Sequence, residues 1–444
     1  MANLMLHSGC CFPSSTPNSS WHLRSINGSS FFFINRFAFS SCRRSSPSPT
    51  LLIQAVVPDG EETAEKGWLS HGGTAAMVAL TVFQMTISGP LGVAEAVLYS
   101  PDTKVPRSAE VALRRAIPAV NSTTKKIQES LEDIFYLLRI PQRKPFGTME
   151  ADVKKAIKLA TDEKDSIIAT VPGNNKDKAN QLYESLTTGK GGLTAMLDAI
   201  ADKDPDKISI RLVSSLETVA QLELLQAPGL PYLVPNEYEK YPRLTGRATI
   251  EFTVKRGEGS TFTVAAGGGP KDAGKIEVVL DGYSAPLTSG NFVNLVMKGA
   301  YDGITLRATE QAVLSDNERS ETGTSLPIEI MPAGEFQPLY RTTLNVQDGE
   351  LPVLPLSVYG AVAMAHSPKS EDFSAPSQFF FYLYDRRSAG LGGLSFDEGQ
   401  FSVIGYVTNG KELLSQLRTG DIIESAKLVS GADRLVFQPV DSTS

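Results

Sequence analysis

Cysteine, tryptophan and histidine are scarce in this sequence, and nearly all of them lie close to its N-terminus. The sequence has three cysteines, two tryptophans and four histidines, and every one except His366 falls within the first 96 residues. Without that segment the chain has one imidazole and no thiol. This excludes disulfides, a cysteine nucleophile and a Cys/His zinc site, and leaves a single imidazole for a Ser-His-Asp arrangement. We therefore expect no metal and no cofactor.

Acidic residues are absent from the first 58 positions, which contain four arginines and many serines. This composition is typical of a transit peptide. The character changes near Gln54 and Ala55, where acidic residues begin to appear. We predict that residues 1–54 are a chloroplast transit peptide and that residues 55–96 are a thylakoid lumen signal.

An apolar run from Thr74 to Val93 is about long enough to span a bilayer. Gln84 and Pro90 interrupt this run, and it ends at Ala94-Glu95-Ala96, the kind of site that a signal peptidase recognises. We therefore favour cleavage after Ala96 over a membrane anchor. The expected location is the thylakoid lumen, with no stable membrane span after processing.

Positive charge is neither abundant nor clustered. The formal net charge is −7, and no dense basic run occurs. Nucleic acid is therefore a poor candidate as a partner.

Residues 97–226 show apolar positions at the three- and four-residue spacing of amphipathic helices. Proline and glycine clusters interrupt this spacing at 141–147, at 172–175 and at 204–205. We predict an all-α helical bundle of four or five helices. A leucine stripe could instead form a dimerising zipper, but the inward face of the bundle's own core is favoured. The clearest stripes are Ile127, Leu131, Ile134 and Leu138; Met149, Val153, Ile157 and Ala160; and Ile208, Leu212, Leu216 and Val219.

Residues 227–243 combine five prolines and glycines with three tyrosines. Proline restricts the backbone and tyrosine rings can pack, so we expect a linker that is docked on its neighbours.

The most informative stretch is 275–303. Residues 275–281 alternate with the period of a strand, and Pro286 then marks the first turn of a helix. Gly299 and Tyr301-Asp302-Gly303 end that helix in a turn. The unit is therefore strand, helix, turn and strand.

This stretch resembles the cyclophilins, whose first helix carries Ala-Pro-x-Thr-x-x-Asn-Phe and whose next turn reads Tyr-Asp-Gly. The resemblance continues at 360–365, 377–381 and 403–407. It implies a cyclophilin-like domain over 244–440, with a closed antiparallel β-barrel capped by two helices. The whole chain would then be multidomain, with the helical bundle before the barrel. The matching residues of the first block are Pro286, Thr288, Asn291, Phe292, Tyr301, Asp302 and Gly303.

The resemblance also implies where a prolyl isomerase site would lie. Cyclophilins use an arginine from a Phe-His-Arg segment, and the segment here reads Leu306-Arg307-Ala308. Ungapped counting puts Ala308 at the arginine position, whereas a one-residue deletion gives the catalytic role to Arg307. A predominantly solvated Arg307 is the alternative to either.

A substrate groove is implied by the residues that match other parts of the family's site. Phe396 takes the position of the family's tryptophan and Phe401 that of its histidine. Packing inside the barrel is the alternative for Gln378 and Phe380, and a surface strand end is the alternative for His366. The complete set is Met364, Ala365, His366, Gln378, Phe380, Phe396 and Phe401.

The helical region, the degenerate site and an insertion between Ser320 and Leu356 together resemble the large thylakoid-lumen cyclophilins. That resemblance implies a chaperone, assembly or maintenance factor that binds lumenal segments of photosynthetic membrane proteins, with weak or no isomerase activity. One alternative is a working peptidyl-prolyl isomerase that uses Arg307. Another is a structural protein that dimerises through its bundle. The sequence leaves the oligomeric state open.

Overall fold

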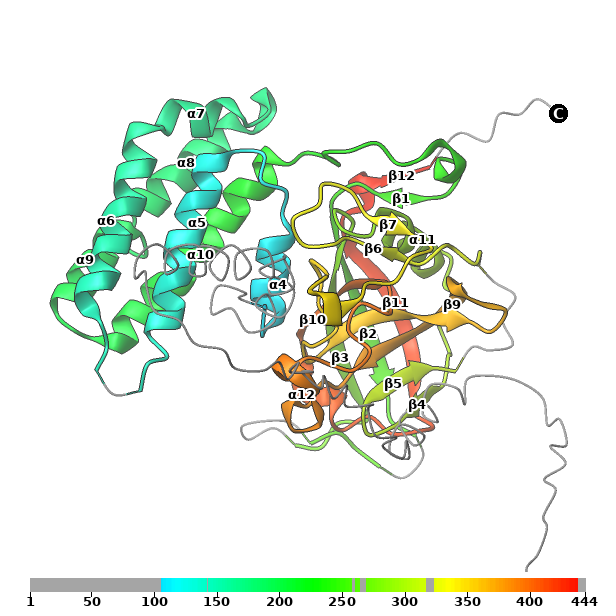
Figure 1. Ribbon diagram of the computed structural model, residues 1–444. Coiled ribbons are helices and arrows are strands. Elements are labelled where there is room, and N and C mark those ends of the chain that lie inside the picture. Colours follow the sequence, from blue (N-terminus) through cyan, green and yellow to red (C-terminus); the bar gives the residue numbers. More distant parts are fainter. Residues whose placement is uncertain (1–104, 142, 258–259, 264–268, 317–322, 438–444) are drawn as a thin grey trace, which may run out of the picture. The chain divides into compact units, whose positions relative to one another are not determined.

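The computed structural model describes residues 105–141, 143–257, 260–263, 269–316 and 323–437. The two predicted leader segments, 1–54 and 55–96, and the predicted cleavage site lie outside these residues. Helices come first along the chain and strands follow (Figure 1).

Seven α-helices occupy the described part of the chain up to residue 226, rather than the predicted four or five. Pro141 and Pro205 do lie at helix breaks, as predicted. The count is higher because α6 and α7 separate at Glu163, where the backbone leaves helical geometry, and because α4 is short. The helices are α4 (Ala109–Ala116), α5 (Ser122–Leu137), α6 (Phe146–Asp162), α7 (Lys164–Ala169), α8 (Lys176–Thr187), α9 (Leu193–Ala201) and α10 (Pro205–Gln226).

Side-chain caps mark where two helices of the bundle, α5 and α10, begin. The Asn121 side chain accepts hydrogen bonds from the first backbone N–H groups of α5, and Asp204 does the same for α10. Each cap satisfies donors that have no partner within the helix. Pro205 then occupies the first turn of α10, where its missing N–H costs nothing.

The predicted apolar stripes meet in one core. Ile127, Leu131 and Ile134 of α5 are fully buried and belong to the same cluster as Leu212 and Val219 of α10. Interpreting the stripes as core positions is therefore confirmed. The burial of these side chains leaves them unavailable to a zipper.

The linker is docked, as predicted. The Tyr283 hydroxyl donates to the carbonyl oxygen of Ala227 at 2.7 Å, and the Tyr232 hydroxyl donates to the carbonyl oxygen of Tyr283, also at 2.7 Å. Tyr238 is buried, and its ring centroid lies 4.8 Å from that of Tyr340.

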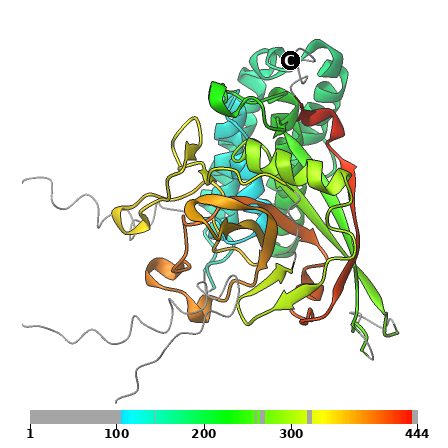
Figure 2. The same ribbon diagram turned by 90° about the vertical axis from the view of Figure 1, so that its right-hand side faces the viewer.

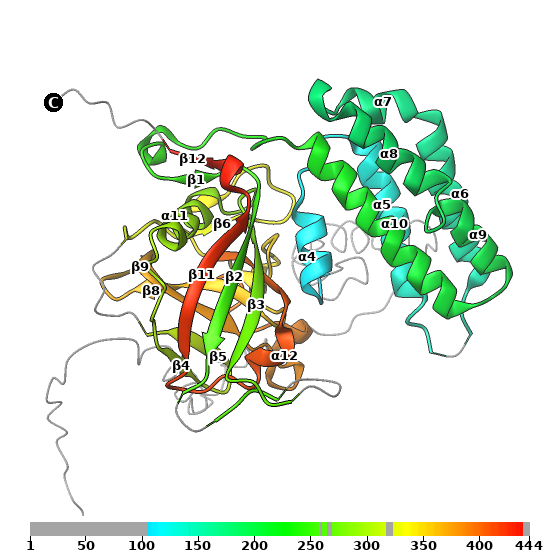
Figure 3. The ribbon, with the colours of Figure 1, turned by 180° about the vertical axis from the view of Figure 1, so that it is seen from behind.

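Eight strands form one antiparallel, strongly curled sheet with the order β11-β2-β3-β10-β8-β9-β5-β4 (Figures 1 and 3). The prediction of a closed barrel is wrong, because the ladder ends at β4 and β11. The segments at these two edges meet at one isolated bridge, Thr305 to Ile422, and through a few backbone hydrogen bonds around it, such as Leu306 N–H to the carbonyl oxygen of Asp421 at 2.7 Å, but they form no continuous ladder in the described part of the chain. The strands are β2 (Arg247–Lys255), β3 (Ala273–Asp281), β4 (Leu306–Ala308), β5 (Ala312–Ser315), β8 (Ala361–Ser367), β9 (Ser370–Tyr382), β10 (Val403–Asn409) and β11 (Ile422–Ser430), with β1 (Arg243–Leu244) and β12 (Leu435–Val436) as a separate pair.

Two helices, α11 (Pro286–Met297) and α12 (Lys411–Leu414), cover opposite ends of the curled sheet, as the resemblance implied (Figure 3). Pro286 lies in the first turn of α11, where the sequence placed it. The α11 residue Phe292 packs edge-on against Phe379 of β9, with ring centroids 5.1 Å apart. Leu414 of α12 is fully buried in the same core.

The described part of the predicted insertion forms loops and one short hairpin, β6 (Glu329–Ile330) with β7 (Leu339–Tyr340) (Figure 2, yellow). Ile328, Ile330 and Leu344 form a small buried cluster within it. The insertion is therefore held together in part by its own buried apolar side chains.

Candidate functional site

The register of the sheet separates the two faces of β9. Residues directly opposite one another in an antiparallel ladder put their side chains on the same face. Phe379 is paired with Met364, and both belong to the main core. Phe380 is paired with Ala363 on β8 and with Leu314 on β5, so its side chain lies on the opposite face.

An aromatic cluster is built on that second face. The ring centroid of Phe401 lies 5.4 Å from that of Phe380, edge-on, and 4.3 Å from that of His366. Phe380 and Phe401 are buried, whereas His366 is partly exposed. The structure thus brings together three residues that the sequence separates by up to 35 positions.

Backbone contacts orient the His366 ring. Its Nδ1 lies 2.9 Å from the carbonyl oxygen of Glu371. A carbonyl oxygen can only accept, so Nδ1 is the donor of this hydrogen bond. His366 is therefore packed on Phe401 and fixed in orientation, and is more than a solvated strand end.

Gln378 lies two residues before Phe380 and shares its face of β9. The Gln378 Nε2 donates to the carbonyl oxygen of Ser315 on β5 at 3.2 Å, and the residue is 9% exposed. This hydrogen bond anchors the amide to the neighbouring strand. Ala365 is also buried, one residue before His366 on β8.

Two predicted groove residues lie away from the aromatic cluster. Met364 is 2% exposed and belongs to the core cluster on the other face of the sheet. Phe396 is 67% exposed and lies in the loop before β10, next to Gly390. Met364 therefore supports the sheet from inside, and Phe396 is accessible to solvent.

The structure decides between Arg307 and Ala308 as the residue on the Phe380 face. Arg307 is paired with Leu314, which is in turn paired with Phe380, so these three share a face. Ala308 is on the other face and packs against the core. Of the two candidates, only Arg307 can reach the aromatic cluster's face.

Arg307 is engaged in an ion pair. Its Nη2 lies 2.9 Å from Oδ1 of Asp316, and both side chains are about one-third exposed, at 33% and 39%. Two strand spacings, roughly 10 Å, separate the Arg307 backbone from that of Phe380. Sequence inspection did not find Asp316, because the pair depends on how β4 and β5 fold back on each other. Asp316 lies nine positions after Arg307, and no local pattern in the sequence links the two.

The described residues also lack the arrangement that a metal site requires. Within the part of the chain that the structure describes, no group of three His, Cys, Asp or Glu side chains is arranged to hold a metal ion. The candidate site consists of apolar and aromatic side chains, the Gln378 amide, the His366 imidazole and the Arg307–Asp316 ion pair.

Comparison with known proteins assigns the family. The chain is 62% identical over 343 residues to the chloroplastic peptidyl-prolyl cis-trans isomerase CYP37 of Arabidopsis thaliana, which covers 77% of this chain and 73% of that protein. This chain is a cyclophilin-type peptidyl-prolyl cis-trans isomerase family member. The family model for that type matches residues 263–434, and the model for the PsbQ-like domain of CYP38-like isomerases matches residues 108–225.

Two further relatives agree. A putative thylakoid lumen peptidyl-prolyl cis-trans isomerase of Synechocystis is 36% identical and covers 73% of this cyclophilin and 83% of its own length. The chloroplastic isomerase CYP38 of Arabidopsis thaliana is 32% identical, with 74% and 75% covered. The predicted membership of the large lumenal cyclophilins and the predicted chloroplast thylakoid lumen location are thereby confirmed. Among the described residues, no helix is both long and apolar enough to cross a membrane.

Proposed function

We propose that this cyclophilin acts mainly as a chaperone, assembly or maintenance factor that binds lumenal segments of photosynthetic membrane proteins, with weak or no isomerase activity. The observation that carries the proposal is the state of Arg307. It is the one candidate cation from the predicted site, and its guanidinium is paired with Asp316.

Prolyl isomerisation is slow because rotation about the peptide bond has a barrier of about 20 kcal/mol. A catalyst lowers this barrier when a donor is held in place before the bond twists. A guanidinium that is one-third exposed and already neutralised by Asp316 offers less of that stabilisation than a preorganised one. We therefore expect weak turnover.

Binding needs less. The partly exposed His366 ring packs on Phe401, and Phe401 packs in turn on the buried Phe380, so the cluster forms a firm aromatic face. Such a surface can hold an apolar or prolyl segment without twisting it. These features support binding as the main activity.

A working isomerase is the second candidate, because Arg307 shares a face with Phe380. Dimerisation through the bundle is less well supported, since the predicted stripes are buried in the bundle's own core.

Turnover of an Ala-Ala-Pro-Phe peptide separates the two leading candidates. We expect near-background rates for the processed chain and for its Arg307→Ala variant. Arg387→Ala is the matched control, because Arg387 is also paired with a neighbouring aspartate, Asp385, but on an exposed turn. Robust turnover that falls about 10²- to 10³-fold in Arg307→Ala, and not in the control, would establish the isomerase instead.

A further inference from the structure

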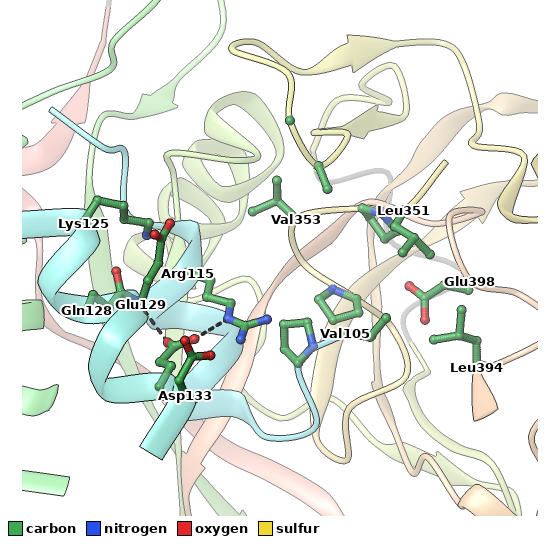
Figure 4. A pocket seen from close by; sticks show the side chains of 16 residues that line it. Val105, Arg115, Lys125, Gln128, Glu129, Asp133, Leu351, Val353, Leu394 and Glu398 are labelled. Atoms are coloured by element: carbon green, nitrogen blue, oxygen red, sulfur yellow. Dashed lines mark hydrogen bonds and ion pairs between the residues drawn. The ribbon is translucent and has the colours of Figure 1, made fainter. Parts of the chain in front are cut away.

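A cavity of about 600 Å³ lies apart from the Phe380 cluster (Figure 4). None of Arg307, His366, Gln378, Phe380 or Phe401 lines it. The lining comes from α4 and α5 on one side, and from residues 333–334, 351–355 and 394–398 on the other. The volume suffices for two or three amino-acid residues of a bound chain.

The two walls of this cavity differ in chemistry. The wall formed by α4 and α5 is polar and charged, and the opposite wall is mostly apolar and contains two prolines. The polar wall consists of Arg115, Lys125, Gln128, Glu129, Glu132 and Asp133; the remaining lining residues are Val105, Pro106, Ala333, Gly334, Leu351, Pro352, Val353, Pro355, Leu394 and Glu398.

Part of the polar wall is internally neutralised. The Arg115 Nε lies 2.6 Å from Glu132 Oε2, and the Arg114 Nε lies 3.2 Å from Glu132 Oε1. Glu129 and Asp133 lie one helical turn apart on α5, so their carboxylates are neighbours. Four carboxyl groups and two basic side chains line the cavity in all, which favours a positively charged occupant.

Two buried polar atoms in this wall lack partners. Gln128 is only 1% exposed, and its Oε1 has no hydrogen-bond partner among the described residues. The Lys125 Nζ, three positions earlier on α5, is likewise unpartnered within that part of the chain. One atom accepts and the other donates. A peptide unit supplies the complement of both, an N–H and a C=O.

Contacts on both sides of α4 hold this wall in place. The Arg107 Nη1 donates to the carbonyl oxygen of Gly393 at 2.7 Å, and the Lys411 Nζ lies 2.6 Å from Glu110 Oε1. The guanidinium of Arg247 also donates to the carbonyl oxygen of Leu113. The cavity therefore has fixed walls on both sides.

We propose that this cavity binds an extended segment of a partner protein that carries an apolar side chain next to a basic one. The apolar side chain packs on Leu351, Val353 and Leu394. Gln128 Oε1 and Lys125 Nζ bond to the peptide backbone once their side chains turn out of the buried positions that they occupy here. The basic side chain reaches Glu129 and Asp133. This second binding site does not depend on the activity proposed for the Phe380 cluster.

Two labelled peptides test the proposal: acetyl-Gly-Leu-Lys-Gly-amide and its acidic counterpart, acetyl-Gly-Leu-Glu-Gly-amide. Fluorescence anisotropy with the full processed chain should show the lysine peptide binding at least about tenfold more tightly than the glutamate peptide, a difference of about 1.4 kcal/mol. The double change Glu129→Gln with Asp133→Asn should weaken the lysine peptide about tenfold, and Gln128→Leu should weaken both peptides.

Matched controls separate this cavity from other sites. Glu184→Gln removes an exposed acid on α8, outside the cavity, and should leave binding unchanged. If the double variant is misfolded by circular dichroism, Glu129→Gln alone, at an exposed position, serves in its place. Equal binding of the two peptides, or binding unaffected by the cavity variants, overturns the proposal. Absence of peptide binding does so too, including the case in which residues 97–104 or a second copy of the chain fill the cavity.

Discussion

The carboxylate of Glu329 accepts hydrogen bonds from both the backbone N–H and the hydroxyl of Thr288, each at 2.9 Å. Glu329 also accepts from the backbone N–H of Leu287 at 3.2 Å. The residue before α11, Ala285, has no side chain able to cap the helix. A buried acid from the insertion therefore supplies the cap, and it ties the insertion to the helix that carries the family's most recognisable motif.

This arrangement gives the protein a specific pH dependence. Burial raises the pKa of Glu329 to about 7, although the hydrogen bonds from Thr288 and Leu287 oppose the shift. The folded state therefore binds a proton more tightly than the unfolded state, whose glutamate has a pKa near 4.5. Stability should rise as pH falls from 8 to about 4.5, with a contribution from this residue of up to roughly 3 kcal/mol.

Glu329→Gln should remove that contribution, because an amide does not titrate. Urea unfolding at pH 5, 6, 7 and 8 measures the free energy of unfolding for both proteins. The variant's pH profile should be flatter than the wild-type profile. Glu150→Gln, which changes an exposed acid on α6, is the control and should follow the wild type. Parallel profiles for Glu329→Gln and wild type would show that Glu329 does not titrate in this range.

Features that depend on residues close together in the sequence could be predicted, whereas this helix cap could not. Pro286 predicted the start of α11, and the spacing of Leu212 and Val219 predicted a buried stripe, because both signals lie within a few residues. Glu329 lies 41 positions from Thr288. No local pattern marks such an acid, so only the folded insertion reveals its partner. Closure of the sheet was mispredicted for a related reason, since the meeting of β4 and β11 depends on distant segments.

A second buried acid, Glu223 of α10, should cost stability at high pH. Its side chain is 3% exposed, and neither carboxylate oxygen has a hydrogen-bond partner in the described part of the chain. Burial, the main cause, and the nearby Glu132 raise its pKa to about 7, against the opposing charge of Lys125. An ionised carboxylate without hydrogen bonds is expensive in such a site.

Glu223→Gln should therefore stabilise the protein at pH 8, by about 1–3 kcal/mol, and have little effect at pH 5, where the wild-type acid is already neutral. Thermal and urea unfolding at the two pH values provide the measurement. Glu217→Gln, at an exposed position of the same helix, should change neither value. Destabilisation of Glu223→Gln at pH 8 would mean that Lys125 requires the negative charge.

Resemblance to the family identified several residues of the candidate site, but the face of the sheet on which each one lies follows only from the strand geometry. Resemblance selected Phe380, Phe401 and His366, which the structure brings together. It also selected Met364, which shares a short motif with Ala365 but faces the core, because neighbouring strand residues point to opposite sides. The same alternation resolves Arg307 against Ala308, a choice that depended on a one-residue gap in the alignment.

Phe379 and Phe380 provide the sharpest test of that assignment, because they are adjacent in sequence and lie on opposite faces. Phe379 packs against Phe252, Phe292, Tyr301 and Phe381, and its ring centroid lies 5.1–5.7 Å from theirs. Phe379→Ala should lower the free energy of unfolding by about 3–5 kcal/mol. Affinity for an Ala-Ala-Pro-Phe peptide should be unchanged in the molecules that remain folded.

Phe380→Ala should lower peptide affinity more than it lowers the free energy of unfolding. Its ring contacts Phe401 and Tyr382 outside the main core, so the loss of stability should be smaller than for Phe379→Ala. Peptide affinity should fall at least about tenfold, because the change removes the buried ring that supports Phe401 on the proposed binding face. Circular dichroism and urea unfolding establish the folded fraction before binding is measured, and Phe379→Leu replaces Phe379→Ala if the latter does not fold. If Phe379→Leu weakens the peptide as much as Phe380→Ala does, the effect comes from general loosening of the sheet, and the Phe380 face is not the binding surface.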